Sequence, residues 1–404
     1  MSQQYHTDNW WVSPFNYHPE VRKQLTDLPK KVRFHDVTCR DGEQTPGVVF
    51  RKEEKLRIAE LLDAMGVDRI EVALPAVSAE DVEAVKAVVK MRPKAKVYVL
   101  SRVTESDIDL AVECGVDGII MEMPVGTPRL KYQFKKWNED TVIEKTLAGL
   151  KYARSKNLDI TVFPMDITRA EPEFFERFLE AIAKSGNKPD GIACVDTTGC
   201  LIPQAAYYMV KRIREITGVT AEIHTHNDFE LGVSTPLAAV AAGAEVVHGS
   251  IAGLGERTGN TSIETVSAAL RALYHVDMDL DFTKMPSTAR EVMKMAKQEI
   301  PLSKPVIGER TFTRESGMGL DLVYEQPLAL FAMHPNWFGE DAKYVLGKKS
   351  GVLSVNLKLK DLGMPDLSDE EKTEVVNRIK AMGIKNKSLV SDDEFKQIVK
   401  EVTS

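Results

Sequence analysis

Two histidines separated by one residue, His224 and His226, give this sequence its clearest chemical signal. They occur in the stretch EIHTHND, residues 222–228, which is typical of a short strand and its end. Side chains two positions apart leave a strand on the same face, so both imidazoles can reach one ion. Neutral imidazoles bind first-row divalent metals. The alternative interpretation is a pair of core histidines or a helix-capping loop.

Further ligands for the same ion occur elsewhere in the chain. Asp41, in the stretch RDGEQ at 40–44, is a candidate third ligand, although it can also cap a turn. Asn260 lies in a glycine-rich stretch that lets a backbone approach a site closely, and it can offer a carbonyl oxygen. Its alternative role is to cap the helix expected after it. One carboxylate, two imidazoles and an amide suit Mg²⁺, Mn²⁺ or Zn²⁺ with positions left for substrate oxygens.

Such a site predicts chemistry at a carbonyl group. A divalent ion polarises a chelating carbonyl as a Lewis acid. Arg40, next to Asp41, can stabilise a developing enolate or oxyanion. Thr197 can hold a substrate carboxylate, or its hydroxyl can be satisfied by nearby backbone.

The elements that must position these residues alternate along the chain. Candidate strands begin near Val32, Arg69, Lys96, Gly118, Asp159, Gly191, Ala221 and Glu245. Amphipathic helical patterns separate them, over residues 52–65, 79–90, 139–155, 173–183 and 204–216 among others. Strands alternating with helices over about 250 residues favour an α/β fold of the (β/α)₈ TIM-barrel type. A doubly wound open sheet is the alternative, but its glycine-rich fingerprint after the first strand is absent.

Active sites of these barrels lie on the loops that follow the strands. Polar residues occur at those places in most of the units: Arg40 and Asp41, Glu71, Glu122, Asp166 and Arg169, Asp196 and Thr197, His224 and His226, and the stretch 253–260. Among them we expect Thr197, Glu71, Glu122 and Arg169 to bind substrate. The convergence is stronger support than any single motif.

The regions outside the barrel differ in character. We expect an aromatic-rich extension over 1–30, the barrel domain over 31–300 and a mostly helical C-terminal extension over 301–404. That extension begins with a proline- and glycine-rich irregular part, 301–355. Ser368 and Ser391 then mark helix starts in a helical tail.

Composition limits the classes of partner. The formal net charge is −7, which does not favour nucleic acid or an anionic membrane surface. No apolar run is long enough to cross a bilayer, and the first residues do not have the pattern of a signal peptide. The 4 cysteines show no CxxC spacing, which predicts a reduced, cytoplasmic protein.

Two long stretches resemble the signatures of the DRE-TIM metallolyases. The first is HDVTCRDGEQTPG, residues 35–47, where the family usually has leucine at Cys39. The second runs from HTHND at 224–228 to GLGERTGN at 253–260. Weaker similarity continues through 313–319 and 346–351. The chain is most similar to the branch of 2-isopropylmalate, homocitrate and citramalate synthases.

The resemblance implies a condensation of an acyl-CoA, with acetyl-CoA the expected donor, onto the carbonyl of a 2-oxo acid, followed by thioester hydrolysis. Carried over position by position, it implies metal ligation by Asp41, His224, His226 and Asn260. It makes Arg40 the electrophilic residue and Thr197 the residue that holds the 2-oxo acid carboxylate. Gln44 would orient a ligand or water. A homodimer or higher homo-oligomer is implied, because the tail of a synthase subunit usually reaches its partner's site.

Several positions depart from the synthase pattern. Gly319 stands where a histidine tied to proton transfer is usual, and Met165 replaces a glutamate. Arg129 displaces the histidine common after the fourth strand. We therefore consider His334 and Tyr344, in the matching tail, as replacement bases, each with packing as its alternative role.

These departures keep a second function open, namely a lyase, aldolase or oxo-acid decarboxylase that uses the same metal–enolate site. Residues 253–260 contain no cysteine, which counts against 3-hydroxy-3-methylglutaryl-CoA lyase itself. A non-catalytic homologue is disfavoured by the intact set of candidate metal ligands.

Overall fold

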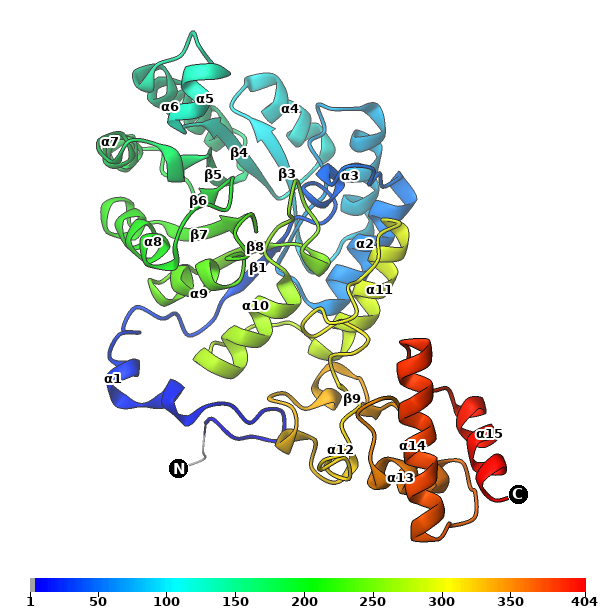
Figure 1. Cartoon of the computed structure of the whole chain (residues 1–404). Coiled ribbons are helices and arrows are strands. Elements are labelled where there is room, and N and C mark those ends of the chain that lie inside the picture. Colours follow the sequence, from blue (N-terminus) through cyan, green and yellow to red (C-terminus); the bar gives the residue numbers. More distant parts are fainter. Residues whose placement is uncertain (1–3) are drawn as a thin grey trace. The chain divides into compact units, whose positions relative to one another are not determined.

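The computed structural model describes residues 4–404, and eight parallel strands form a closed barrel in it (Figure 1). The strands are β1 (Arg33–Asp36), β2 (Arg69–Glu71), β3 (Lys96–Arg102), β4 (Gly118–Pro124), β5 (Asp159–Met165), β6 (Gly191–Asp196), β7 (Thr220–Thr225) and β8 (Val246–Gly249). Pairing of β1 with β8, from Arg33 opposite Val246 to Asp36 opposite Gly249, closes the barrel. The TIM-barrel prediction is confirmed.

Helices connect the strands and lie outside them (Figure 1). They are α2 (Lys52–Met65), α3 (Ala79–Met91), α4 (Glu105–Cys114), α5 (Thr127–Tyr132), α6 (Glu139–Ser155), α7 (Pro172–Lys184), α8 (Pro203–Thr217), α9 (Ser234–Ala241) and α10 (Ile263–Ala269), with α1 (Pro19–Arg22) before the barrel and α11 (Met285–Met295) after it. In α7, Phe174, Phe178 and Ile182 are buried at helical spacing. This stripe fixes the face that packs on the barrel.

The inside of the barrel is polar, which is unusual because branched apolar residues normally fill such interiors. Arg69 of β2 bonds Glu222 of β7, and these two strands are not neighbours in the sheet. Side chains that meet across the barrel must point inward. Since side chains alternate along a strand, Glu71 and His224 point inward as well. These inward-facing polar and charged side chains extend toward the carboxyl ends of the strands.

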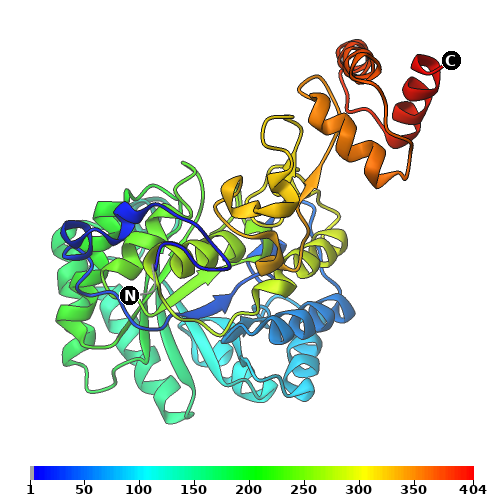
Figure 2. The ribbon, with the colours of Figure 1, turned by 90° about the horizontal axis from the view of Figure 1, so that it is seen from below.

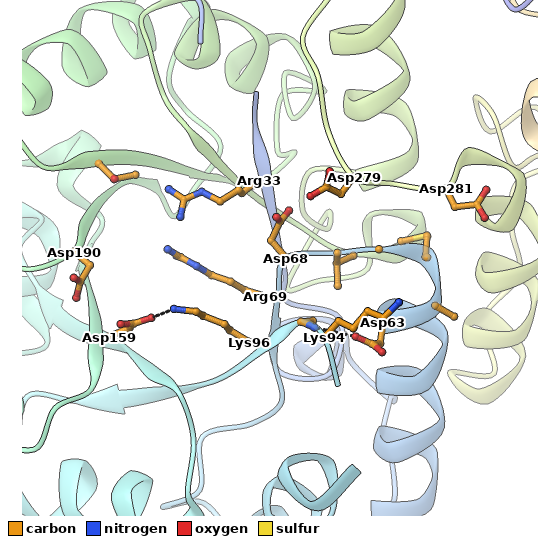
Figure 3. Close-up of a pocket in the computed structure, with 16 residues that line it drawn as sticks. Arg33, Asp63, Asp68, Arg69, Lys94, Lys96, Asp159, Asp190, Asp279 and Asp281 are labelled. Atoms are coloured by element: carbon orange, nitrogen blue, oxygen red, sulfur yellow. Dashed lines mark hydrogen bonds and ion pairs between the residues drawn. The ribbon is translucent and has the colours of Figure 1, made fainter. Parts of the chain in front are cut away.

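The amino ends of the strands surround a cavity of about 820 Å³ (Figure 3). Arg33, Arg69 and Lys96 line it together with several aspartates, and Lys96 reaches Asp159 at 2.5 Å. None of the residues that the sequence nominates for the site lines this cavity. The candidate site therefore belongs to the opposite end of the barrel.

A second compact unit combines the described residues up to Ser13 with Pro301–Ser404, while Pro14–Ile300 form the barrel unit. The stretch 1–30 thus divides between the units, and its first three residues lie outside the described part. The second unit contains β9 (Thr313–Arg314), β10 (Lys343–Tyr344), α12 (Leu322–Glu325), α13 (Val352–Asp361), α14 (Asp369–Asn386) and α15 (Asp392–Val402).

Its helices enclose a core of their own. Helix α14 packs against both α13 and α15 (Figures 1 and 2). Ser368 and Ser391 each accept a hydrogen bond from a glutamate backbone N–H three residues later, as the capping boxes predicted. The parallel pair of β9 and β10 is a feature that the irregular pattern of 301–355 did not indicate. None of the helices in residues 4–404 has the length and apolarity to cross a membrane.

Candidate active site

Three potential metal ligands converge at the carboxyl ends of the strands. Nε2 of His224 lies 3.3 Å from Nε2 of His226 and 3.6 Å from Oδ2 of Asp41. His226 Nε2 lies 4.0 Å from the same oxygen. Ligand atoms held about 2.1 Å from one ion are roughly 3.0–3.5 Å apart. The separations of 3.3, 3.6 and 4.0 Å lie within or slightly above that range, so a small inward movement of the Asp41 carboxylate would bring the three donors around one divalent cation. Across residues 4–404, this is the one such group of three histidine, cysteine or acidic side chains.

The pKa shifts of these three groups give them the protonation states that metal ligands require. Burial lowers the pKa of His224 and of His226 below the ordinary value, so both imidazoles are neutral at neutral pH. Burial alone would raise the pKa of Asp41, but the Arg40 guanidinium, helped by the hydrogen bond from Asn260, outweighs burial and lowers that pKa. Neutral imidazoles beside an ionised carboxylate are ready to bind a metal without first losing protons.

Asn260 lies against this group. Its Nδ2 donates to Oδ1 of Asp41 at 3.0 Å, and its backbone pairs with that of His226. Its Oδ1 is buried and has no hydrogen-bond partner in the part of the chain that the structure describes. The cap of α10 is Ser262, so the helix-cap alternative for Asn260 is wrong. A Cβ at Gly255 would lie 2.2 Å from Asn260 Nδ2, which explains why glycine is needed there.

The Arg40 guanidinium is held by hydrogen bonds at two of its three nitrogens. Its Nε donates to Oε1 of Glu71 at 2.5 Å, and its Nη1 donates to Oδ2 of Asp41 at 2.7 Å. The remaining nitrogen, Nη2, is buried and has no hydrogen-bond partner among residues 4–404. A buried guanidinium donor without an acceptor is costly, so its retention suits a group that an incoming oxygen completes.

Asp166 connects several loops at the same end. It is a fully buried, non-glycine residue at φ 66°. Its carboxylate accepts two hydrogen bonds of 2.7 Å from Arg169 and lies 4.0 Å from Nε of Arg129. Its backbone N–H donates to Oγ1 of Thr197 at 2.8 Å. The Thr197 oxygen is thus satisfied by backbone, as the alternative predicted, while its own proton remains available to an acceptor.

Glu122 and Gln44 are the least constrained of the nominated residues. The Glu122 side chain is partly buried and makes no hydrogen bond to the described residues. Burial raises its pKa, and the neighbouring carboxylate of Glu71 adds to the rise, although Arg40 opposes it. Gln44 is exposed at the end of a 3₁₀ turn, Gly42–Gln44.

His334 and Tyr344 belong to the second unit. Nδ1 of His334 accepts a hydrogen bond of 3.2 Å from the backbone N–H of Asn336, which caps a 3₁₀ turn, Pro335–Phe338. This bond occupies the lone pair of Nδ1. Tyr344 is buried, and its hydroxyl donates to Oδ2 of Asp361 at 2.5 Å. Burial, together with Asp361, raises the pKa of Tyr344.

Sequence reasoning missed three polar residues of the barrel interior, His35, Glu222 and His248. All three are buried, and their hydrogen bonds link the site to the floor of the barrel. The available signal was a polar residue at the inward-facing alternate position of an apolar strand. Residues with that pattern occur in β1, β2, β7 and β8.

Comparison with known proteins agrees with this architecture. The family model described as HMGL-like matches residues 31–292, and the model described as homocitrate synthase post-HMGL domain-like matches residues 306–387. The homocitrate synthase AksA of Methanothermobacter thermautotrophicus is 34% identical over 97% of this chain and 98% of its own length.

Other curated relatives carry different names. The 2-isopropylmalate synthase of Methanocaldococcus jannaschii is 35% identical over 95% of this chain and 74% of its own length. The (R)-citramalate synthase CimA of the same organism is 34% identical over 92% of this chain and 75% of its own length. Among solved structures, the HMG-CoA lyase of Bacillus subtilis superposes with a TM-score of 0.61 at 19% identity, covering 68% of this chain and 97% of that one. This last similarity supports the fold alone.

Proposed function

The chain belongs to the HMGL-like family, the DRE-TIM metallolyases, and from this premise we propose that it is a divalent-metal-dependent acyltransferase. In the reaction, the α-carbon of an acyl-CoA, with acetyl-CoA the expected donor, forms a bond to the carbonyl carbon of a 2-oxo acid. Water then cleaves the thioester, which releases free CoA and a 2-hydroxy acid with a new carboxylate. The single observation that carries the proposal is the unpartnered Nη2 of Arg40 beside Asp41, His224 and His226.

The residues divide the chemistry among them. Asp41, His224 and His226 would hold a Mg²⁺, Mn²⁺ or Zn²⁺ ion, and Asn260 offers its free Oδ1 as a fourth contact. A divalent ion supplies Lewis-acid polarisation of the 2-oxo carbonyl. Arg40 donates from Nη2 to the carbonyl oxygen as negative charge develops on it. Gln44, at the rim, orients a ligand or water.

The electrophile would occupy the side of the site formed by β4, β5 and β6. Thr197 donates its free hydroxyl proton to the carboxylate of the 2-oxo acid. Arg169 and Arg129 add positive charge, since they share the single carboxylate of Asp166. Glu122, near Arg40 and Glu71, would face the distal part of the substrate.

The proton acceptor for the acyl-CoA is proposed to come from the second unit. The histidine usual in the synthases is Gly319 here, and its φ of +63° is a conformation that side chains rarely adopt. Another residue must then take the proton. Of the two nominated replacements, we favour His334. Its ring is partly buried, and its Nδ1 can accept a proton once the cap bond from the Asn336 N–H opens, whereas the Tyr344 hydroxyl already donates to Asp361.

A homo-oligomer is part of the proposal. Exposed apolar side chains occur in five of the segments that follow the barrel strands: Val49, Val77, Tyr132 (the last residue of α5), Ile202 and Phe229. Single exposed apolar residues are ordinary, but several around one rim mark a surface that another chain covers. A second copy of this chain, assembled as a homodimer, is the proposed occupant.

The second candidate function is a lyase, aldolase or decarboxylase that forms the same enolate by bond cleavage. Met165, partly buried at the end of β5, supplies no acid or base, which favours this class. Incubation of the protein with synthetic 2-hydroxy-2-alkyl dicarboxylates, with detection of released oxo acid in the absence of CoA, distinguishes the two.

The decisive experiment measures release of free CoA thiol. Metal-replete protein is mixed with acetyl-CoA and a panel of 2-oxo acids of varied distal groups. We expect release with one or a few of them, its loss with a chelator, and its restoration by added metal. Asp41→Asn should abolish both bound metal and release, while the surface variant Lys184→Gln changes neither. No release with any oxo acid would sink the proposal.

A further inference from the structure

Two imidazoles are stacked inside the barrel, below the candidate site. The ring centroids of His35 and His248 are 4.4 Å apart, with 26° between their planes. The two residues are directly paired on β1 and β8. Both are fully or almost fully buried. Neither belongs to the candidate metal ligands, so their role needs a separate account.

Each imidazole forms a hydrogen bond with a different glutamate. Nε2 of His35 lies 2.9 Å from Oε2 of Glu71, and Nε2 of His248 lies 2.7 Å from Oε2 of Glu222. Burial, reinforced by the neighbouring His248, lowers the pKa of His35 to about 4, so its ring is neutral at neutral pH. The pKa of Glu71 is lowered to about 2, because Arg40 and His35 outweigh the effect of burial. His35 therefore donates its Nε2 proton to an ionised carboxylate.

The remaining carboxylate oxygens, Oε1 of Glu71 and Oε1 of Glu222, accept hydrogen bonds from arginines at opposite ends of the barrel. Oε1 of Glu71 accepts from Nε of Arg40, at the carboxyl end of the barrel. Oε1 of Glu222 accepts from Nη1 of Arg69 at 2.8 Å, and Arg69 lines the cavity at the amino end (Figure 3). Each histidine–glutamate pair thus binds one arginine: His35 and Glu71 hold Arg40, and His248 and Glu222 hold Arg69. Of the two arginines, Arg40 alone lies at the candidate site.

We infer that His35 is a positioning residue that acts through Glu71 to aim the free Nη2 of Arg40 at the reacting oxygen. The inference rests on the proposed function and assigns a role to a residue outside its ligand set. A guanidinium held at Nε by Glu71 and at Nη1 by Asp41 has one orientation left for Nη2. Without the His35 donor, one Glu71 oxygen is buried without a partner and the carboxylate can turn. A small misplacement of a catalytic donor is enough to lower the rate strongly.

Four variants test the inference, because His248 offers a matched control. His35→Phe and His248→Phe each remove one buried imidazole donor from one glutamate, whereas His35→Gln and His248→Gln keep an amide N–H there. With metal and acetyl-CoA saturating, we expect His35→Phe to lower kcat about 10- to 100-fold. The KM for acetyl-CoA and the Kd for Mn²⁺ should stay within about 3-fold of wild type.

His35→Gln should recover most of the lost rate. His248→Phe should keep kcat within about 3-fold of wild type. It should nevertheless lower Tm as much as His35→Phe does, because each variant loses one buried hydrogen bond. Since the His248 ring also lies edge-on to His224, at 5.6 Å between centroids, the Mn²⁺ affinity of His248→Phe is measured separately. Equal losses of kcat in the two phenylalanine variants, or no loss in either, would overturn the inference. If His35→Phe does not fold, His35→Asn, whose amide is too short to reach Glu71, replaces it with the same expectation.

A structural measurement separates this inference from the proposed function. Crystal structures of wild type, His35→Gln and His35→Asn should show the Arg40 guanidinium in one orientation in the first two and displaced or split in the third. That outcome supports the positioning role even if no 2-oxo acid yields free thiol, in which case the proposed function alone fails. An unchanged Arg40 in His35→Asn overturns the positioning role whatever the assay shows.

Discussion

Asn260 donates a hydrogen bond of 3.0 Å from Nδ2 to Oδ1 of Asp41, which ties the loop after β8 to the loop after β1. The bond occupies one oxygen of the Asp41 carboxylate. The other oxygen, Oδ2, faces Nε2 of His224 at 3.6 Å and Nε2 of His226 at 4.0 Å. Asn260 therefore orients the carboxylate toward the imidazoles and offers its own buried Oδ1 at the same place.

Removal of this amide should weaken metal binding. We expect Asn260→Ala to raise the Kd for Mn²⁺ about 10- to 100-fold, since groups that orient metal ligands typically contribute that much. Isothermal titration of metal-free protein measures the effect. Asn227→Ala, which removes an amide from the adjacent loop, serves as the control. A Kd unchanged in Asn260→Ala would contradict the role assigned to Asn260.

The charge on Glu122 should select the distal group of the 2-oxo acid. A second carboxylate placed near Glu122 meets a like charge in a partly buried site, and such contacts are strongly unfavourable. We expect Glu122→Gln to raise kcat/KM for a 2-oxo dicarboxylate at least about 10-fold relative to that for an uncharged 2-oxo acid of similar length. Glu113→Gln, on the outer helix α4, is the matched control. An unchanged ratio would remove Glu122 from the substrate-binding set.

His334 can be tested without loss of its structural role. Asparagine caps helix ends as well as histidine does but cannot accept a proton from the acyl-CoA. We expect His334→Asn to keep the Tm of the full chain and to lower kcat at least about 100-fold. Tyr344→Phe, which removes a buried hydrogen bond to Asp361, should instead lower stability by about 1–3 kcal/mol. Full activity in His334→Asn, together with a loss of activity in Tyr344→Phe, would assign the role of general base to Tyr344 instead.

Stability should fall as the pH drops from about 6.5 to about 4. The unfolded chain protonates a histidine below its ordinary pKa of 6.5, whereas folded His35 protonates only near 4. Between these values the unfolded state binds more protons, so acid favours unfolding, by roughly 3 kcal/mol at most for this residue. Urea unfolding of chelator-treated protein at pH 7 and pH 5 measures the slope.

The variant His35→Gln supplies the comparison for that slope. His224 and His226, whose pKa values are also lowered, keep contributing in the same direction. The variant should therefore lose part of the pH dependence between 6.5 and 4 and retain the rest. An identical slope in wild type and variant would mean that His35 is not held neutral in the folded barrel.

The sequence by itself determined the number and order of the barrel units, because each is a local pattern. The starts of β2, β3, β4, β5 and β6 are as predicted, and those of β1, β7 and β8 differ by one residue. The family also follows from local motifs, since both signatures are continuous stretches. The proximity of Asp41 to His224 and His226 was predictable because parallel strands bring their carboxyl ends to one face.

Tertiary structure alone decided how the charges pair. Nothing local shows that Glu71 divides its oxygens between Arg40 and His35, or that Asp166 is shared by Arg169 and Arg129. Except for the local pair of Asp166 and Arg169, these contacts join residues from different strands or the segments that follow them, so they depend on strand register. A shift of one residue in that register would turn each side chain to the other face of its strand. The partners of Arg40, and with them the one guanidinium nitrogen left free for chemistry, exist only once the barrel is closed.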